Sequence, residues 1–190
     1  MSRVDLVILG LLVERPRHGY DIKQQIEKRS MYHWIGVSTP ALYRGLARLE
    51  SKRMLEAHTE SGTSHPDRTV YSITDAGREH MQSLLVEALT DLKPVFFDVV
   101  GGIGFAHNMP RELLLDSLET RRGRLVELLA RIDEADAEVA ATPQFPVTAR
   151  EIPGFYRGYV EMQIEWLDHV VVRIRRIRNW PEGAFKPCKH

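Results

Sequence analysis

An amphipathic segment in the first third of the chain constrains its fold more than any other feature. Leu42, Leu46 and Leu49 recur at intervals of four and three residues, the spacing of one face of an α-helix. At about 100° per residue, Arg44 and Arg48 fall on the opposite face. The segment is therefore expected to be a helix whose leucine face is buried in a core. Its opposite face, called the front below, is small, basic and exposed to solvent.

The residues that open this helix add hydrogen-bonding groups to the same front. Thr39 can cap the exposed amides, and Pro40 suits the first helical position, where no amide hydrogen is needed. A front of this kind can enter the DNA major groove, where Arg reads guanine edges and Tyr, Ser or Thr hold phosphates. The candidate DNA-contacting residues of the helix are Ser38, Thr39, Tyr43, Arg44 and Arg48. The competing interpretation is an ordinary solvated helix, since amphipathic basic helices are common.

Two short alternating segments follow the helix and suggest a β-hairpin. Residues 54–59 and 68–74 read as strands, and residues 60–67 between them are rich in turn-forming types. A helix followed by a hairpin is the helix–wing unit of a winged helix-turn-helix. At its tip, His65 and Arg68 can lie along a phosphate backbone or reach a minor groove. The alternative is a plain surface hairpin with a solvated arginine.

The residues before the helix complete a three-helix unit. Residues 4–13 are mostly apolar and read as a buried first helix, and residues 20–29 form an amphipathic positioning helix. Residues 30–36 are expected to be a turn between helices. His18 is interpreted as a turn or capping residue, because no neighbour in sequence completes a metal site.

Three stretches, taken together, resemble the PadR-like transcriptional regulators. Residues 18–22 (HGYDI), 37–50 (VSTPALYRGLARLE) and 66–77 (PDRTVYSITDAG) are similar, in the same order, to that family's second helix, recognition helix and wing. Arg44 stands where the family often has Pro. The resemblance implies a repressor that binds double-stranded DNA and responds to a small hydrophobic or aromatic effector.

Charge and motif content narrow the functional classes. The chain has 190 residues with 26 Lys and Arg against 26 Asp and Glu, but residues 1–74 hold 11 basic and 8 acidic side chains, which places the positive charge in the winged part. The single cysteine, Cys188, excludes an internal disulfide framework and suits a reducing cytoplasm. There is no membrane-spanning stretch, and no catalytic, cofactor or metal motif, so we expect a cytoplasmic protein that is not an enzyme.

The second half of the chain predicts long helices that need a partner. Residues 110–141 carry heptad-spaced Leu118, Leu125 and Ile132, with Leu128 among the intervening positions. Residues 153–179 form a helix with two apolar stripes, of which one can pack within the chain. The second stripe predicts a homodimer, because a second copy is the simplest cover for it. Its members are Phe155, Tyr159, Met162 and Trp166.

An apolar, glycine-containing stretch at residues 94–107 separates these regions. It is expected to be either a buried core helix or a hinge that lines a ligand cavity. Aromatic walls give apolar contact area, and glycines ease backbone movement. The candidate effector-binding residues are Phe96, Phe97, Phe105 and Trp166.

The sequence therefore predicts a mostly α chain with a small β wing. Residues 1–77 would be a winged helix-turn-helix DNA-binding domain, residues 78–179 an antiparallel helical dimerisation domain, and residues 180–190 a tail. The expected function is a sequence-specific repressor that binds a pseudo-palindromic operator as a homodimer. The alternative is a non-enzymatic helical protein-interaction adaptor built on a winged-helix scaffold.

Overall fold

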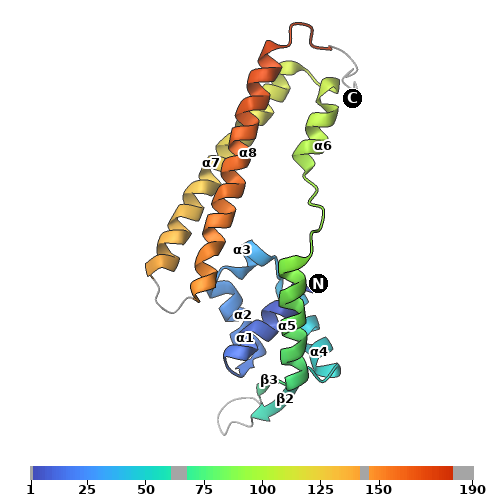
Figure 1. The fold of residues 1–190 in the computed structure, drawn as a ribbon, viewed down its shortest axis with the longest axis vertical. Coiled ribbons are helices and arrows are strands. Elements are labelled where there is room, and N and C mark those ends of the chain that lie inside the picture. The colour runs from blue at the N-terminus through green and yellow to red at the C-terminus, as the bar shows by residue number, and fades with distance from the viewer. Residues whose placement is uncertain (1, 61–67, 142–145, 182–190) are drawn as a thin grey trace. The chain divides into compact units, whose positions relative to one another are not determined.

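A computed structural model describes residues 2–60, 68–141 and 146–181 of the chain (Figure 1). The chain divides into two compact units, Met1–Pro94 and Val95–His190. The first unit has five helices and a three-stranded sheet among its described residues, and the second is helical throughout what is described. This architecture confirms the mostly α class with a small β wing. No helix of the described ranges is long and apolar enough to cross a membrane.

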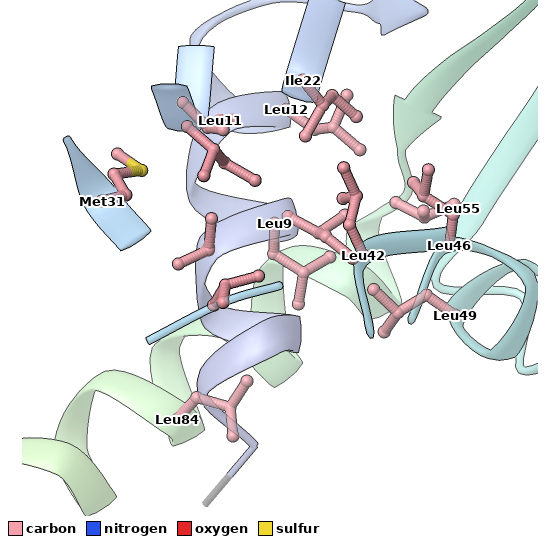
Figure 2. Close-up of a cluster of buried hydrophobic side chains, with 14 residues drawn as sticks. Leu9, Leu11, Leu12, Ile22, Met31, Leu42, Leu46, Leu49, Leu55 and Leu84 are labelled. Carbon is pink, nitrogen blue, oxygen red and sulfur yellow. The ribbon is translucent and has the colours of Figure 1, made fainter. Parts of the chain in front are cut away.

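Helix α1 (Arg3–Glu14) is the centre of the first unit (Figure 2). Ile8, Leu9, Leu11 and Leu12 are at most 2% exposed, so α1 is buried on most of its circumference. Burial of this extent explains why the segment lacks the one-sided pattern of a surface helix. The surrounding elements are α2 (Gly19–Lys28), α3 (Met31–Ile35), α4 (Thr39–Ser51) and α5 (Asp75–Thr90).

Helix α4 presents its leucine stripe to α1. Leu42, Leu46 and Leu49 are all at most 1% exposed, as the spacing predicted. The two helices approach closely at Gly45, where a Cβ atom would lie 2.6 Å from Cγ1 of Val4 and 2.7 Å from Cδ1 of Ile8. A glycine at this point therefore sets how close α4 lies to α1.

The sheet has one strand more than the sequence predicted. Strands β2 (Leu55–Glu60) and β3 (Arg68–Ile73) form the expected antiparallel hairpin, and the two-residue β1 (Arg17–His18) pairs with the other edge of β3. Nδ1 of His18 lies 3.2 Å from the carbonyl oxygen of Thr69. His18 therefore joins the start of α2 to the wing, and its side chain makes no helix cap.

The stretch 30–36, expected to be a turn, contains the short helix α3. Ser30 and Gly36 flank it with positive φ angles of 50° and 72°. Left-handed residues at both ends let the chain reverse sharply around a single helical turn. Sequence periodicity cannot detect a helix this short.

A charged cluster closes the end of α1. The Glu14 carboxylate accepts hydrogen bonds from Arg29 and from Arg17. The Arg29 hydrogen bond is the largest cause of the lowered pKa of Glu14. Arg17 is only 5% exposed and also donates from Nε to the carbonyl oxygen of Leu11, so this pair of arginines ties β1 and α2 to α1.

Helix α5 begins with a side-chain cap. The hydroxyl oxygen of Thr74 accepts a hydrogen bond from the amide of Gly77 at 3.1 Å. Gly77 itself lies so close to the connection between α4 and β2 that a Cβ atom would be 2.2 Å from the carbonyl oxygen of Met54. Leu84, further along α5, is 4% exposed within the core around α1.

The second unit is a helical hairpin with shorter attached helices. Helices α7 (Arg111–Ala141) and α8 (Glu151–Arg176) run antiparallel, side by side (Figure 1), and Arg121 of α7 donates to Gln163 of α8 at 2.7 Å. The hairpin core is formed by Leu114, Leu118, Leu125, Val160, Leu167 and Ile174. The heptad prediction is wrong at Leu128, which is 38% exposed, because Leu129 packs on this core instead.

Residues 94–107 contain α6 (Asp98–Phe105), followed by the short helix η1 (Ala106–Asn108). No residue of α6 is buried, so the expectation of a helix buried on several sides is not met in the single chain. Ile103 alone among its residues is partly buried against the hairpin core. A second short helix, η2 (Val147–Arg150), precedes α8.

The close contact at Gly77 predicts that alanine substitutions at Gly77 and at Gly10 change the stability of the protein in opposite directions. Gly77→Ala should destabilise the protein by about 1–3 kcal/mol, because its methyl group collides with a backbone oxygen that cannot move aside. Gly10→Ala in α1 is the matched control, since a Cβ there meets nothing within 4 Å, and it should stabilise by about 0.5–1 kcal/mol through helix propensity. Urea unfolding followed by circular dichroism measures both. Equal stabilities of the two variants would contradict the close approach.

Candidate nucleic-acid interface

The front of α4 is exposed along its whole length. Thr39, Tyr43 and Arg44 all face solvent, opposite the buried leucines. The helix starts one residue earlier than predicted: Ser38 is the residue before its first turn and makes no side-chain cap. Thr39 is therefore helical and does not cap the helix, and Pro40 takes the second position. The hydroxyl groups of Ser38 and Thr39 thus lie at the exposed N-terminus of α4 and make no hydrogen bond with the described residues.

The two arginines of this front differ in their surroundings. Arg44 is exposed, and its side chain makes no hydrogen bond or ion pair with the described residues. Arg48 is 43% exposed at its side chain, and its Nη2 donates to Oδ1 of Asp5 in α1. Arg44 is thus an unengaged cation in the middle of the front, whereas Arg48 is held at the flank that faces α1.

A cleft of about 470 Å³ lies beside Tyr43, between α4, the start of α2 and the wing. The Tyr43 ring packs on Gly19, whose Cβ, if present, would lie 3.3 Å from a ring carbon. The residues that line the cleft are His18, Gly19, Tyr20, Asp21, Tyr43, Thr69 and Tyr71. Hydroxyl groups from three separate elements therefore border one hollow next to the front of α4.

Tyr71 contributes a neutral hydroxyl to this cleft. Burial raises its pKa, and the nearby Glu50 and Tyr43 add to the effect. A neutral phenol can donate a hydrogen bond to an anion without charge repulsion. The cleft thus offers hydroxyl donors beside the carboxylate of Asp21.

The wing carries the remaining two candidates. Arg68 is the first residue of β3, where its backbone pairs with that of Glu60. Its side chain is not among those that the structure describes. His65 lies outside the described residues. The hairpin nevertheless follows α4 directly, in the arrangement that the sequence predicted.

Sequence reasoning missed the groups that hold Arg48. Asp5 is 6% exposed, and its second carboxylate oxygen lies 3.9 Å from Nε2 of His80 in α5. The usable signal was an acidic residue inside an otherwise apolar run, since a buried carboxylate requires a partner. The sequence alone does not reveal which cation supplies it.

Comparison with known proteins identifies the family. A model of the "Transcriptional regulator PadR-like family" matches residues 8–83. An uncharacterised protein X of Lysinibacillus sphaericus is 32% identical over 86 residues, which span 45% of this chain and 78% of that protein. The chain belongs to the PadR-like family of transcriptional regulators. A probable transcriptional regulator of Mycobacterium tuberculosis, Rv1176c, is 29% identical over 87 residues, or 46% of each protein.

Solved structures extend the likeness of this PadR-like chain to nearly its whole length. Bacillus subtilis PadR in complex with operator DNA matches with a TM-score of 0.76 at 16% identity, covering 91% of this chain and 99% of that one. The same PadR with p-coumaric acid matches at a TM-score of 0.75, 15% identity and coverage of 92% and 97%. The Vibrio cholerae virulence activator AphA matches at 0.69, 22% identity and coverage of 90% and 98%. At these identities the matches show a shared fold.

Family and fold together establish the general role. The protein is a DNA-binding transcriptional regulator and not an enzyme. The adaptor alternative is therefore set aside.

The candidate residues of the second unit divide into exposed and packed ones. Phe155 and Met162 are 72% and 51% exposed, whereas Trp166 and Tyr159 are partly buried against the hairpin core. Phe97 stacks on Tyr159 with ring centroids 5.8 Å apart. The last two effector candidates, Phe96 and Phe105, are 90% and 74% exposed, so in the single chain they do not enclose a cavity.

Proposed function

We propose that this PadR-like regulator is a repressor that binds a pseudo-palindromic operator as a homodimer. Arg44 is exposed in the centre of the α4 front and has no side-chain partner in the part of the chain that the structure describes, and this observation carries the DNA-binding part of the proposal. A repressor acts by covering a promoter on the chromosome. We therefore place this protein in the cytoplasm. The supporting likeness to operator-bound Bacillus subtilis PadR concerns the fold.

The contacts are assigned from where the donors lie. Arg44 reads base edges in the major groove, and Arg48 contacts DNA from the flank of the same helix. Hydroxyl groups of Ser38, Thr39 and Tyr43 hold the phosphate backbone beside α4. The wing residues His65 and Arg68 reach the backbone or the adjacent minor groove.

The homodimer is proposed from apolar surface that one chain leaves open. Val100 and Phe105 of α6 and Phe155 and Met162 of α8 are each more than half exposed. Large exposed apolar side chains favour an interaction surface, and a second copy would cover them with a symmetric contact. Two-fold symmetry would present two α4 helices to half-sites about one helical turn apart.

The effector is proposed from the same region. Phe96 and Phe105 supply exposed aromatic surface that a second copy would enclose. Phe97 stacks on Tyr159, and Trp166 lies in the neighbouring hairpin core. Bacillus subtilis PadR has been crystallised with p-coumaric acid. A small aromatic or hydrophobic compound could release this regulator only by binding one dimer geometry better than another, with a coupling of about 1–3 kcal/mol being ordinary.

Operator binding tests the role of Arg44. Selection of bound duplexes from random DNA should yield a pseudo-palindrome, and Arg44→Ala should weaken its binding by about 1–3 kcal/mol and relax specificity at one position of each half-site. Lys28→Ala, which removes the same charge at the far end of α2 from the cleft, should bind as wild type. Titrations at several salt concentrations measure both. Wild-type affinity of Arg44→Ala would refute the assignment.

Dimerisation is tested with exposed residues, because Trp166 is partly buried in its own hairpin core. Phe155→Glu with Met162→Glu should give a monomer at micromolar concentration, since loss of a buried anchor typically costs about 2 kcal/mol or more. Val147→Glu, in the exposed η2 helix, is the control. Sedimentation velocity gives the mass. A dimer in the double variant would move the interface elsewhere, and a monomeric wild type would remove the dimer altogether.

Repression and release are tested in one transcription assay. The protein should lower transcription from a promoter that contains the selected operator, and p-coumaric acid or a related small aromatic acid should restore it. The same compound should change tryptophan emission in wild type and not in Trp166→Phe. An increase in transcription in this assay would contradict the repressor role and make the protein an activator. Quenching without loss of operator affinity would exclude the switch.

A further inference from the structure

The carboxylate of Asp5 is buried in the first turn of α1. The residue is 6% exposed, and its own amide is capped by the hydroxyl oxygen of Ser2 at 3.3 Å. Removing a carboxylate from water is costly unless a cation and hydrogen bonds compensate. The groups that compensate Asp5 therefore define what this residue does.

Those groups come from two other helices. Nη2 of Arg48 in α4 donates to Oδ1 of Asp5 and lies 3.5 Å from the hydroxyl oxygen of Ser2. Oδ2 of the same carboxylate lies 3.9 Å from Nε2 of His80 in α5. One carboxylate of α1 thus faces the DNA-recognition helix on one side and α5 on the other.

The helix crossing at Gly45 fixes the geometry of this contact. Gly45 is buried against Val4 and Ile8, and Arg48 follows it by one turn on the same flank of α4. Because α4 cannot slide over such a close contact, Arg48 is directed to the first turn of α1. The ion pair with Asp5 is therefore built into the packing of the two helices.

Arg48 keeps donors free for another ligand. Its side chain is 43% exposed, and its Nε and Nη1 make no hydrogen bond to the residues that the structure describes. A guanidinium has five donors in one rigid plane, so one nitrogen can hold a carboxylate while the others meet an acceptor outside the protein.

We propose that Asp5 is a positioning residue for operator recognition, which fixes the guanidinium of Arg48 so that its free nitrogens meet the DNA in one orientation. An arginine held in place before binding loses less side-chain entropy on contact, and its hydrogen bonds have a defined direction. Asp5 itself touches no DNA; it acts through Arg48. The inference rests on the DNA-binding role proposed above for the front of α4.

The charge of Asp5 is tested by Asp5→Asn, with Glu14→Gln as the matched control. Both substitutions remove an α1 carboxylate that pairs with arginine, but Glu14 pairs with Arg17 and Arg29, away from Arg48. Asp5→Asn should weaken operator binding about tenfold, within the range for one arginine contact. Binding to unrelated DNA should stay the same or strengthen, because one negative charge is lost. Glu14→Gln should leave the operator-to-unrelated ratio at its wild-type value.

A double variant separates positioning from general destabilisation. In an Arg48→Ala background, Asp5→Asn should have no further effect on operator affinity, because the residue it positions is gone. Additive losses, or equal losses on operator and unrelated DNA, would overturn the proposal.

If Asp5→Asn does not fold, Arg48→Lys carries the test. It keeps the charge but loses the planar fork, and it should lose specificity about tenfold. Wild-type specificity of Arg48→Lys would overturn the inference equally. If the wild type selects no operator, the proposed function fails; if it does and Asp5→Asn matches it, only the role of Asp5 fails.

Discussion

The close crossing of α1 and α4 is the contact on which the first unit depends. Gly45 lets the two helices approach until Val4 and Ile8 touch the α4 backbone region. The leucines of α4 then complete the core around α1 (Figure 2). Since interiors are close-packed, this crossing leaves α4 a single orientation. The exposed side of α4 is thus a consequence of what its other side buries.

The same packing gives the two arginines of the front different properties. Arg44 is exposed and has no side-chain partner among the described residues, whereas Arg48 lies on the flank next to α1 and pairs with Asp5. A free arginine can adapt to a base edge but must lose rotamer freedom when it binds. An arginine held by an ion pair donates its hydrogen bonds in a fixed direction but can reach fewer positions. The front therefore combines an adaptable donor with a fixed one.

Local patterns were enough to predict most elements of the first unit, and long-range contacts were not. The leucine spacing and the wing strands depend on neighbours in sequence, and the structure confirms them. The β1 strand and the Asp5–Arg48 pair join residues more than 40 positions apart, which no periodicity reports. The prediction for Leu128 was wrong because one heptad register was extended over the whole helix. At this point of the helix Leu129 packs on the core instead. The site residues of α4 remain a prediction.

The two units differ in how much of their apolar surface a single chain buries. The first unit encloses the leucines of α1 and α4 and leaves apolar side chains such as Leu89 (85% exposed) open near the end of α5, whereas the second leaves Phe105 and Phe155 about three-quarters exposed. Apolar surface of this kind is stable in water mainly when something covers it. If a second copy provides the cover, folding of the second unit and assembly are linked, and operator affinity depends on protein concentration. Any compound that enters this surface would then act on assembly and on DNA binding through one equilibrium.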